Sequence, residues 1–385
     1  MKIAYSLGSI GNSGGIERVI STKANYFADN LSYEVHIIVS GEQPTSLFYH
    51  FSDKIHFHYL DISSGKRSLW NYFFPSKEDK RYKQKLESLL FQVKPDITIS
   101  TFGRDASFLY KLKDGSKKVL EFHFTKNYLK HLSDSLENDK LRWIRKYWLK
   151  FLLWKEEQTT KHYQHIVVLT ERDKQLWGGD DRFAVIPNPL SFQTEKTAPL
   201  NTKIILSMGR LVYPKGFQYL IRAFHTIARE FPDWRIEIYG KGHDRERLQN
   251  EINILSLQNQ IILKAPDPDV KSLMMRADLF VLPTLYDGFG LVLTEAMVCG
   301  VPCISFDSEC GPGEIIRTDE DGFLVPSKNI DALAEKMKFL MNDQNLRISM
   351  GQKAKKNVQR FSTEKIGKAW QSYFESITST QSQNS

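Results

Sequence analysis

The sequence predicts an α/β protein of two domains, each built on a parallel β-sheet. Segments typical of strands and of helices alternate in both halves of the chain, as they do in βαβ units. The length of 385 residues exceeds what one hydrophobic core usually organises. A polar segment that starts at Pro187 and extends to about Thr202 separates the halves and predicts a linker. The hydrophobic content of 41% and the charged content of 25% are those of a soluble globular protein.

The elements of the first half predict one sheet whose loops share an edge. In open α/β sheets ligands bind beyond the carboxyl ends of the strands, so residues that directly follow strands are candidate site residues. Arg104 is such a residue, with a surface arginine as the equal alternative. His123 is a second one, with a structural hydrogen bond as its alternative role. Strands are predicted at 2–7, 35–39, 55–59, 96–100, 118–122 and 165–170, and a charged helix at 77–93.

A glycine-rich loop at 8–18 follows the first predicted strand and opens a helix that extends to about Asn30. Gly14 and Gly15 allow the backbone to come close to a ligand. The helix N-terminus that follows suits an anion such as a phosphate. A plain strand-to-helix turn explains a Gly-Gly pair equally well, so the loop alone does not decide between the two interpretations.

A helix predicted over 138–163 combines aromatic and basic side chains, and it holds three of the seven tryptophans. Two interpretations fit its apolar residues, which recur at helical spacing. The helix packs on its own sheet with its lysines in solvent, or it lies in a membrane interface beside anionic lipids. Residues 1–190 hold 29 Lys and Arg against 22 Asp and Glu, and this basic surplus favours the membrane. The residues expected to contact the membrane are Trp143, Arg145, Lys146 and Lys150.

The second half repeats the alternation, and its loops carry cations and glycines. A strand at 203–207 precedes a loop that contains Arg210 and Lys215. Two cations at the carboxyl end of a strand would neutralise a diphosphate. Gly240 lies where the next strand turns into a helix. Further elements are predicted at 261–264, 269–276, 303–307, 330–342 and 345–360, with a last amphipathic helix from an N-cap at Ser362 to about Ile377.

A strand, a glycine turn and a helix follow one another between residues 279 and 298. The turn is Asp287-Gly288-Phe289-Gly290, and the helix begins at Leu291. Free backbone N–H groups and the positive end of the helix dipole therefore point at one spot, which suits a phosphate. Asp287 precedes this spot, and Glu295 lies about one turn inside the helix. Such a pair can accept hydrogen bonds from sugar hydroxyls on both sides of a diphosphate, which is the layout of a nucleotide sugar.

The acid-x7-Glu spacing of Asp287 and Glu295 resembles the signature of family 4 retaining glycosyltransferases, which have the GT-B fold. The family usually has Glu at the first position, where this chain has Asp287. Further segments that resemble the family are Gly14-Gly15-Ile16-Glu17-Arg18, the strand followed by His123, Ile186-Pro187-Asn188-Pro189, and the loop from Gly209-Arg210 to Lys215-Gly216.

The resemblance implies two facing Rossmann-like domains with parallel sheets and a C-terminal helix that crosses back to the first domain. The implied boundaries are 1–186 for an acceptor-side domain, 187–361 for a nucleotide-sugar-binding domain, 362–378 for the crossover helix and 379–385 for a disordered tail.

The resemblance also implies roles for individual residues. Catalytic roles would belong to His123, Arg210, Lys215 and Asp287. Donor binding would involve Gly14, Gly15, Arg210, Lys215, Gly240, Asp287, Gly288, Phe289, Gly290, Leu291 and Glu295. The acceptor side would involve Glu17, Arg18 and Arg104. The two cations and the helix N-terminus would stabilise the departing diphosphate, so neither a metal ion nor another cofactor is expected.

The implied activity is transfer of a hexose-type sugar, with retention, from a nucleotide diphosphate sugar. A UDP-sugar is favoured and a GDP-sugar is the second candidate. The acceptor would be a saccharide or a polyprenyl-diphosphate-linked saccharide in capsule or lipopolysaccharide assembly. The expected location is the cytoplasm, with an anionic membrane surface at the inner face of the plasma membrane as a further partner. No apolar run approaches the roughly 20 residues of a membrane span, no signal peptide opens the chain, and Cys299, Cys303 and Cys310 are expected to be reduced.

Two other classes remain as alternatives. A nucleotide-sugar epimerase has the same fold and needs no acceptor. A nucleic-acid binder could use the basic first half, but the acids at 287 and 295 would repel phosphate backbones, and aromatic residues do not alternate with cations on the predicted strands. Nucleic acid is therefore not an expected partner.

Overall fold

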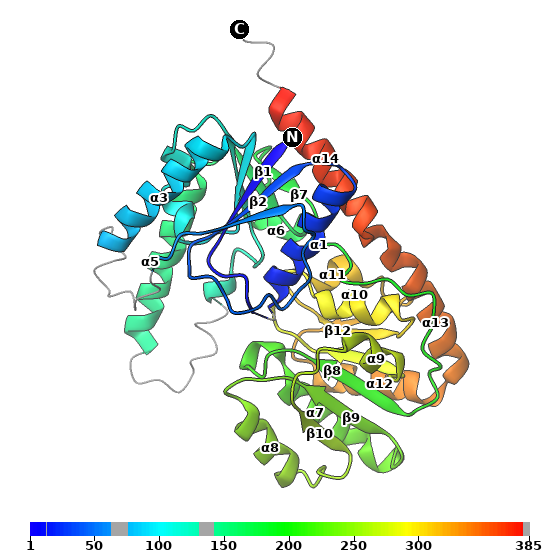
Figure 1. Ribbon diagram of the computed structural model, residues 1–385. Coiled ribbons are helices and arrows are strands. Elements are labelled where there is room, and N and C mark those ends of the chain that lie inside the picture. The colour runs from blue at the N-terminus through cyan, green and yellow to red at the C-terminus, as the bar shows by residue number, and fades with distance from the viewer. Residues whose placement is uncertain (13, 63–75, 131–141, 380–385) are drawn as a thin grey trace.

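Two parallel β-sheets organise the chain, and a computed structural model describes it over residues 1–12, 14–62, 76–130 and 142–379 (Figure 1). Within these residues the first sheet has the strand order β3-β2-β1-β4-β5-β6-β7, and the second has the order β10-β9-β8-β11-β12-β13. In both sheets the chain starts on an inner strand, builds outward on one side and then crosses to the other, which is doubly wound topology. We call the part that carries the first sheet the first lobe and the part that carries the second sheet the second lobe.

The strands of the first lobe are β1 (Lys2–Leu7), β2 (Glu34–Val39), β3 (Ile55–Tyr59), β4 (Ile97–Ser100), β5 (Lys117–Glu121), β6 (His165–Val168) and β7 (Phe183–Val185). Those of the second lobe are β8 (Ile204–Met208), β9 (Arg235–Tyr239), β10 (Ile261–Lys264), β11 (Leu279–Leu282), β12 (Cys303–Asp307) and β13 (Gly322–Pro326). Most residues of the inner strands are buried on both faces, because helices cover both sides of a parallel sheet.

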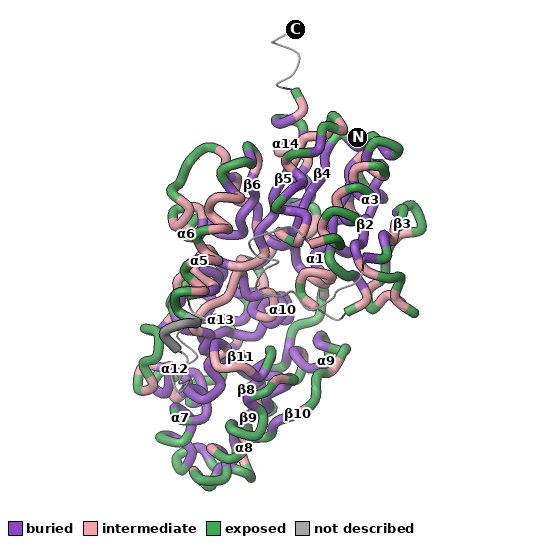
Figure 2. The backbone as a smooth tube through the Cα atoms, turned by 90° about the vertical axis from the view of Figure 1, so that its left-hand side faces the viewer, coloured by how far each residue is buried: buried purple, intermediate pink, exposed green. Residues whose placement is uncertain are grey.

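The main helices of the first lobe are α1 (Gly15–Asp29), α3 (Lys77–Val93), α5 (Arg142–Thr160) and α6 (Glu171–Leu176). The second lobe has α7 (Phe217–Ile227), α8 (Arg245–Ile254), α9 (Val270–Met275), α10 (Leu291–Val298), α11 (Pro312–Ile315), α12 (Ile330–Asn342) and α13 (Gln344–Asn357). A last helix, α14, covers Thr363–Ser379. Buried residues run through both sheets and continue from one lobe into the other (Figure 2).

Helix α14 leaves the second lobe and packs beside α1 of the first lobe (Figure 1). Trp370 and Phe374 of α14 are buried, and their rings lie 6.5 and 5.5 Å from the ring of Phe27 on α1. A Cβ at Gly367 would lie 2.1 Å from Cε1 of Tyr26, so the two helices approach closely at this glycine. Large apolar contacts therefore fix the end of the chain to the first lobe.

The predicted fold class is confirmed, including the two parallel-sheet lobes and the helix that crosses back. Strand β13 was not predicted, because only three apolar residues stand between Gly322 and Pro326. The helix predicted over 138–163 is described from Arg142 to Thr160, since residues 131–141 lie outside the described part of the chain. The exact domain boundaries stay a prediction, and the tail from residue 380 onward also lies outside the described residues.

Candidate active site between the two lobes

Three loops of the second lobe meet at the carboxyl edge of its sheet, and glycines make their close packing possible. Gly216 has φ of +74°, and a Cβ there would lie 1.7 Å from the carbonyl oxygen of Pro283. A Cβ at Gly240 would lie 2.0 Å from the carbonyl oxygen of Gly209. Because no side chain fits at these contacts, the loops after β8, β9 and β11 are held against one another. This edge is where doubly wound sheets bind their ligands.

A cation and a carboxylate from two of these loops form an ion pair. Lys215 Nζ lies 2.5 Å from Asp287 Oδ2, and both side chains remain partly exposed. Arg210 is exposed, and its charge lowers the pKa of the Tyr286 hydroxyl, although burial raises that pKa by more. The structure thus brings Arg210, Lys215 and Asp287 into one region, as the sequence predicted. It also shows that Lys215 already has a partner in Asp287.

The start of α10 lies beside this ion pair. Gly290 precedes the helix with φ of +101°, and no side chain caps the first turn. The Phe289 ring is buried against Phe361, at 5.2 Å between ring centroids, so only the backbone of Phe289 is available to a ligand. The first backbone N–H groups of α10, beginning at Leu291, therefore face the loop edge with the positive end of the helix dipole.

Glu295, the second acid of the sequence signature, is 1% exposed and is bound by an arginine from the other lobe. Its Oε1 accepts a hydrogen bond from Nη1 of Arg18 on α1. Burial raises the pKa of the Glu295 carboxyl, and the Arg18 charge acts in the opposite direction. The structure places Arg18 in contact with Glu295, a predicted donor-binding residue, and the acceptor-side role expected for Arg18 stays a prediction.

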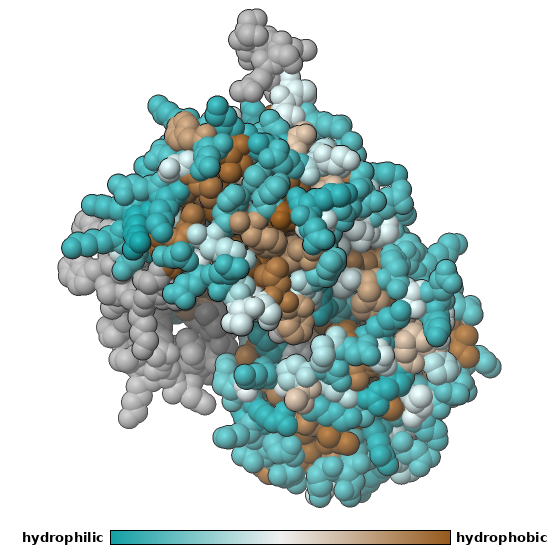
Figure 3. Space-filling view, in the orientation of Figure 1, coloured by the Kyte–Doolittle hydropathy of each residue, from teal (hydrophilic) through white to brown (hydrophobic). Residues whose placement is uncertain are grey.

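The two lobes touch around the predicted site. A Cβ at Gly288 would lie 2.4 Å from the carbonyl oxygen of His123, and one at Gly15 would lie 3.5 Å from Cδ1 of Leu291. Arg172 of α6 also reaches across, with Nη1 2.6 Å from Asp307 Oδ1. On the face drawn in Figure 3, hydrophilic residues cover most of both lobes, and hydrophobic residues gather toward their junction. The start of α1, with Gly14, Gly15 and Glu17, thus lies close to the start of α10.

His123 follows β5, and its imidazole points back into the first lobe. Its Nε2 lies 3.4 Å from Oε1 of Glu121, which also binds Lys23 Nζ from α1. Burial lowers the pKa of His123 to about 4, so the imidazole is neutral near neutral pH. Sequence reasoning missed Glu121 and Lys23. The available signal was a charged residue at 121 between the apolar residues 119–120 and 122.

Arg104 binds within the first lobe. Its Nη2 lies 2.7 Å from Oδ1 of Asp79 on α3, and its Nε lies 3.1 Å from the same oxygen. The structure therefore shows an intramolecular partner for this arginine, and an acceptor-side role for it stays a prediction.

The residues predicted to contact a membrane lie on α5. Lys146 and Lys150 are exposed, while the side chains of Trp143 and Arg145 lie outside the described part. Two more aromatic residues of this helix, Tyr147 and Trp154, are 69% and 55% exposed. Among the described residues, no helix has the length and apolar character to cross a bilayer.

The described residues contain no group of three or more His, Cys, Asp or Glu side chains arranged to hold a metal ion. Cys299, Cys303 and Cys310 are buried free thiols. The expectation that the protein works without a metal remains a prediction.

Comparison with known proteins identifies the second half of the chain. The family description "Glycosyl transferases group 1" matches residues 191–357. The chain is 28% identical to an uncharacterized glycosyltransferase of Haemophilus influenzae over 378 residues, which cover 96% of this chain and 98% of that protein. It is 38% identical over 221 residues to an exopolysaccharide phosphotransferase of Streptomyces coelicolor, where the match covers 56% of this chain but only 23% of that protein.

Solved structures confirm the fold. A structure of Staphylococcus aureus TarM in complex with fondaparinux, α-GlcNAc-glycerol and UDP superposes with a TM-score of 0.74, covering 97% of this chain and 99% of that one at 15% identity. At this identity the likeness concerns the fold alone. Together with the family match it shows that the chain has the GT-B fold and that its residues 191–357 are a domain of the glycosyl transferases group 1 family.

Proposed function

We propose that this protein transfers a hexose-type sugar from a nucleotide diphosphate sugar to an acceptor in cell-surface polysaccharide assembly, with retention of anomeric configuration. A UDP-sugar is the favoured donor, and a GDP-sugar is the second candidate. The acceptor is a saccharide or a polyprenyl-diphosphate-linked saccharide. The Streptomyces relative is named for exopolysaccharide, and the TarM structure contains UDP, which supports these choices.

One observation carries the proposal. Lys215 and Asp287 pair on loops at the carboxyl edge of the second sheet, Arg210 acts on the neighbouring Tyr286, and Glu295 of α10 is bound by Arg18 of the first lobe. When the bond between sugar and diphosphate breaks, negative charge develops on the departing phosphate oxygen. Two cations and a helix N-terminus aimed at that oxygen stabilise it without the need to reorganise.

We propose that binding of the donor breaks the ion pair between Lys215 and Asp287. The diphosphate takes over Lys215 Nζ, and the released Asp287 carboxylate accepts hydrogen bonds from the transferred sugar. Because Lys215 and Arg210 supply the positive charge, the proposed reaction does not require a divalent ion. The neutral imidazole of His123 rests on Glu121 and does not act as the base in this proposal. Through its backbone carbonyl, which lies against the turn at Gly288, His123 helps to position the part of the site that meets the sugar.

Donor screening tests this function. Thermal shift and saturation-transfer NMR across UDP-, GDP- and ADP-sugars should single out one nucleotide, and NMR of the product should show a retained anomeric configuration. Lys215→Ala should weaken binding of the nucleoside diphosphate by about 10- to 100-fold and that of the monophosphate much less, since a charge-assisted hydrogen bond is lost. Lys203→Ala is the matched control, because Lys203 binds Asp233 in an exposed pair, 2.9 Å apart, before β8 begins.

Two outcomes would contradict the proposal. If no nucleotide sugar binds, the function is wrong. If the donor alone is converted to a sugar isomer without any acceptor, the protein is an epimerase.

We also propose that α5 contacts an anionic membrane, because exposed lysines and aromatic side chains share this helix. Reversing the charges of Lys146 and Lys150 to Glu should weaken binding to liposomes that contain anionic lipid and leave donor binding unchanged. The same double reversal at Lys353 and Lys356, which are exposed on α13, is the matched control. Equal liposome binding by the α5 variant and the parent would exclude this contact.

A further inference from the structure

Arg18 joins the two lobes at the predicted donor site. It stands in the first turns of α1, and Glu295 stands on α10, 277 residues later in the chain. Besides its bond to Glu295, the guanidinium donates from Nε to the Tyr49 hydroxyl at 3.2 Å, and it lies 5.4 Å from the Tyr49 ring centroid. These contacts hold the guanidinium on two sides, so Arg18 has one defined direction across the junction of the lobes.

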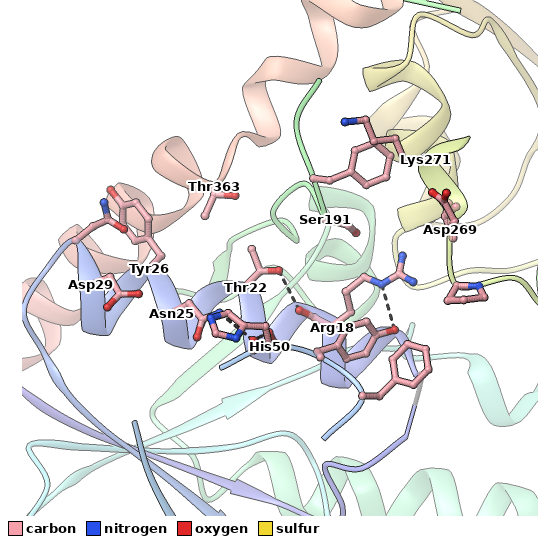
Figure 4. Close-up of a pocket in the computed structure, with 17 residues that line it drawn as sticks. Arg18, Thr22, Asn25, Tyr26, Asp29, His50, Ser191, Asp269, Lys271 and Thr363 are labelled. Atoms are coloured by element: carbon pink, nitrogen blue, oxygen red, sulfur yellow. Dashed lines mark hydrogen bonds between the residues drawn. The ribbon is translucent and has the colours of Figure 1, made fainter. Parts of the chain in front are cut away.

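A cavity of about 540 Å³ adjoins this arginine. Figure 4 shows the Arg18 side chain rising from α1 into the cavity, with Ser191 and Asp269 on the side opposite the helix. Ser191 belongs to the segment that connects the lobes, and Asp269 caps α9. The wall of the cavity is therefore assembled from both lobes, and its shape depends on how they close.

The two oxygens of Glu295 differ in their surroundings. Oε1 is held by Arg18, whereas Oε2 is buried without a close hydrogen bond, and the buried Ser191 hydroxyl lies near enough to the carboxyl to lower its pKa. A buried carboxylate oxygen without a donor is rare in native proteins, because its lost hydration is not replaced. Apart from the Ser191 hydroxyl, this oxygen has no close donor among the described residues. A hydroxyl group of a ligand could share this acceptor with Ser191.

We propose that Arg18 is a positioning residue for donor recognition, which it controls from the opposite lobe. By binding Oε1 it fixes the orientation of the Glu295 carboxyl group and so turns Oε2 toward a ribose hydroxyl of the bound nucleoside diphosphate. This inference rests on the proposed function and adds to it a cross-lobe contribution. Recognition of the ribose then requires that the lobes be closed, because Arg18 and Glu295 belong to different lobes.

The test compares two ligands, UDP and 2′,3′-dideoxy-UDP, by calorimetry with the full chain. The parent should bind UDP about 10- to 100-fold more tightly than the dideoxy compound, as a hydroxyl bound to a buried carboxylate requires. In Arg18→Ala the affinity for UDP should fall by a similar factor, while that for the dideoxy compound changes little. The ratio between the ligands therefore collapses toward one. A purely structural role of Arg18 would lower both affinities together and leave the ratio intact.

Three further variants complete the experiment. Arg18→Lys should restore part of the ratio, because one ammonium donor replaces the guanidinium. Tyr49→Phe keeps Arg18 and removes only the hydroxyl that binds it, and should lower the ratio about threefold to fivefold. This variant tests the inference even if Arg18→Ala does not fold. Arg222→Ala is the control, since Arg222 pairs with Glu251 on the outside of the second lobe.

Two results would overturn the inference. The first is an unchanged ratio in Arg18→Ala. The second is tighter UDP binding by that variant, which would mean that Arg18 blocks Glu295. Failure of the parent to bind any nucleoside diphosphate would instead refute the proposed function, and the inference with it.

Discussion

Replacing Gly288 with alanine is expected to hold the two lobes apart. A Cβ at this position would lie 2.4 Å from the carbonyl oxygen of His123 and 3.1 Å from the Cα of Phe124. Ordinary van der Waals contact begins at 3.4 Å, so the lobes would have to separate by about 1 Å at this point. Backbone atoms on both sides form the contact, and no flexible side chain can move away. A displacement of about 1 Å between reacting groups can lower a rate by about 100-fold.

The measurement is the release of UDP from the donor in a coupled assay, with and without acceptor. Gly288→Ala should lower kcat/KM by about 100-fold and leave the melting temperature close to that of the parent, because the change lies between the lobes and not in either core. Gly8→Ala is the matched control, since a Cβ at Gly8 meets no atom within 4 Å. A Gly288→Ala enzyme that keeps its kcat/KM within a few-fold of the parent would refute the reasoning, because contact between the lobes at Gly288 would then be dispensable.

Three further predictions concern stability. Gly216→Ala should lower the free energy of urea unfolding by more than about 2 kcal/mol, because a φ of +74° is combined with a Cβ that lies 1.7 Å from the carbonyl oxygen of Pro283. Gly115→Ala is the control, with φ of +89° and open space around the Cβ, and should lower it by only about 1 to 2 kcal/mol. Equal losses in the two variants would show that the close contact at Gly216 does not matter. His123 has a folded-state pKa of about 4 against about 6.5 when unfolded, so the change in unfolding free energy between pH 7 and pH 5 should be less favourable in the parent than in a His123→Asn variant by about 2 kcal/mol, because the unfolded chain takes up the proton; equal changes in the two proteins would contradict this. Trp370→Ala should lower the free energy of unfolding by about 3 to 5 kcal/mol, because this ring of α14 is 1% exposed and packs against Phe27 of α1. A loss below about 1 kcal/mol would show that α14 contributes little to stability.

The parts of the site that the sequence predicted correctly are those whose signals lie within one short segment of the chain. The strand, turn and helix of residues 279–298 are found as β11 at Leu279–Leu282 and α10 at Leu291–Val298. Their signals, an apolar run, two glycines and a series of helix-forming residues, act within about 20 residues of one another. The convergence of Arg210, Lys215 and Asp287 also followed, because the carboxyl ends of parallel strands necessarily share an edge.

The pairing of charges between distant elements was not predictable. Arg18 and Glu295 are 277 residues apart, and nothing near either residue specifies the other. Arg104 was assigned to an anionic partner because it follows a strand, yet it binds Asp79 on α3. In both cases the sequence identifies the loop or helix that carries the charge. The partner depends on how two elements pack, and that is a property of the whole fold.

The contact of α14 with α1 affects how the first lobe folds during synthesis of the chain. The strands of the first lobe end at Val185, whereas the helix that covers the outer side of α1 begins at Thr363. At about 5 to 20 residues per second, a ribosome needs roughly ten to thirty seconds to add the intervening chain. During that interval Phe27 lacks its cover from Trp370 and Phe374. The nascent first lobe therefore exposes an apolar face of α1 until the last helix has been made.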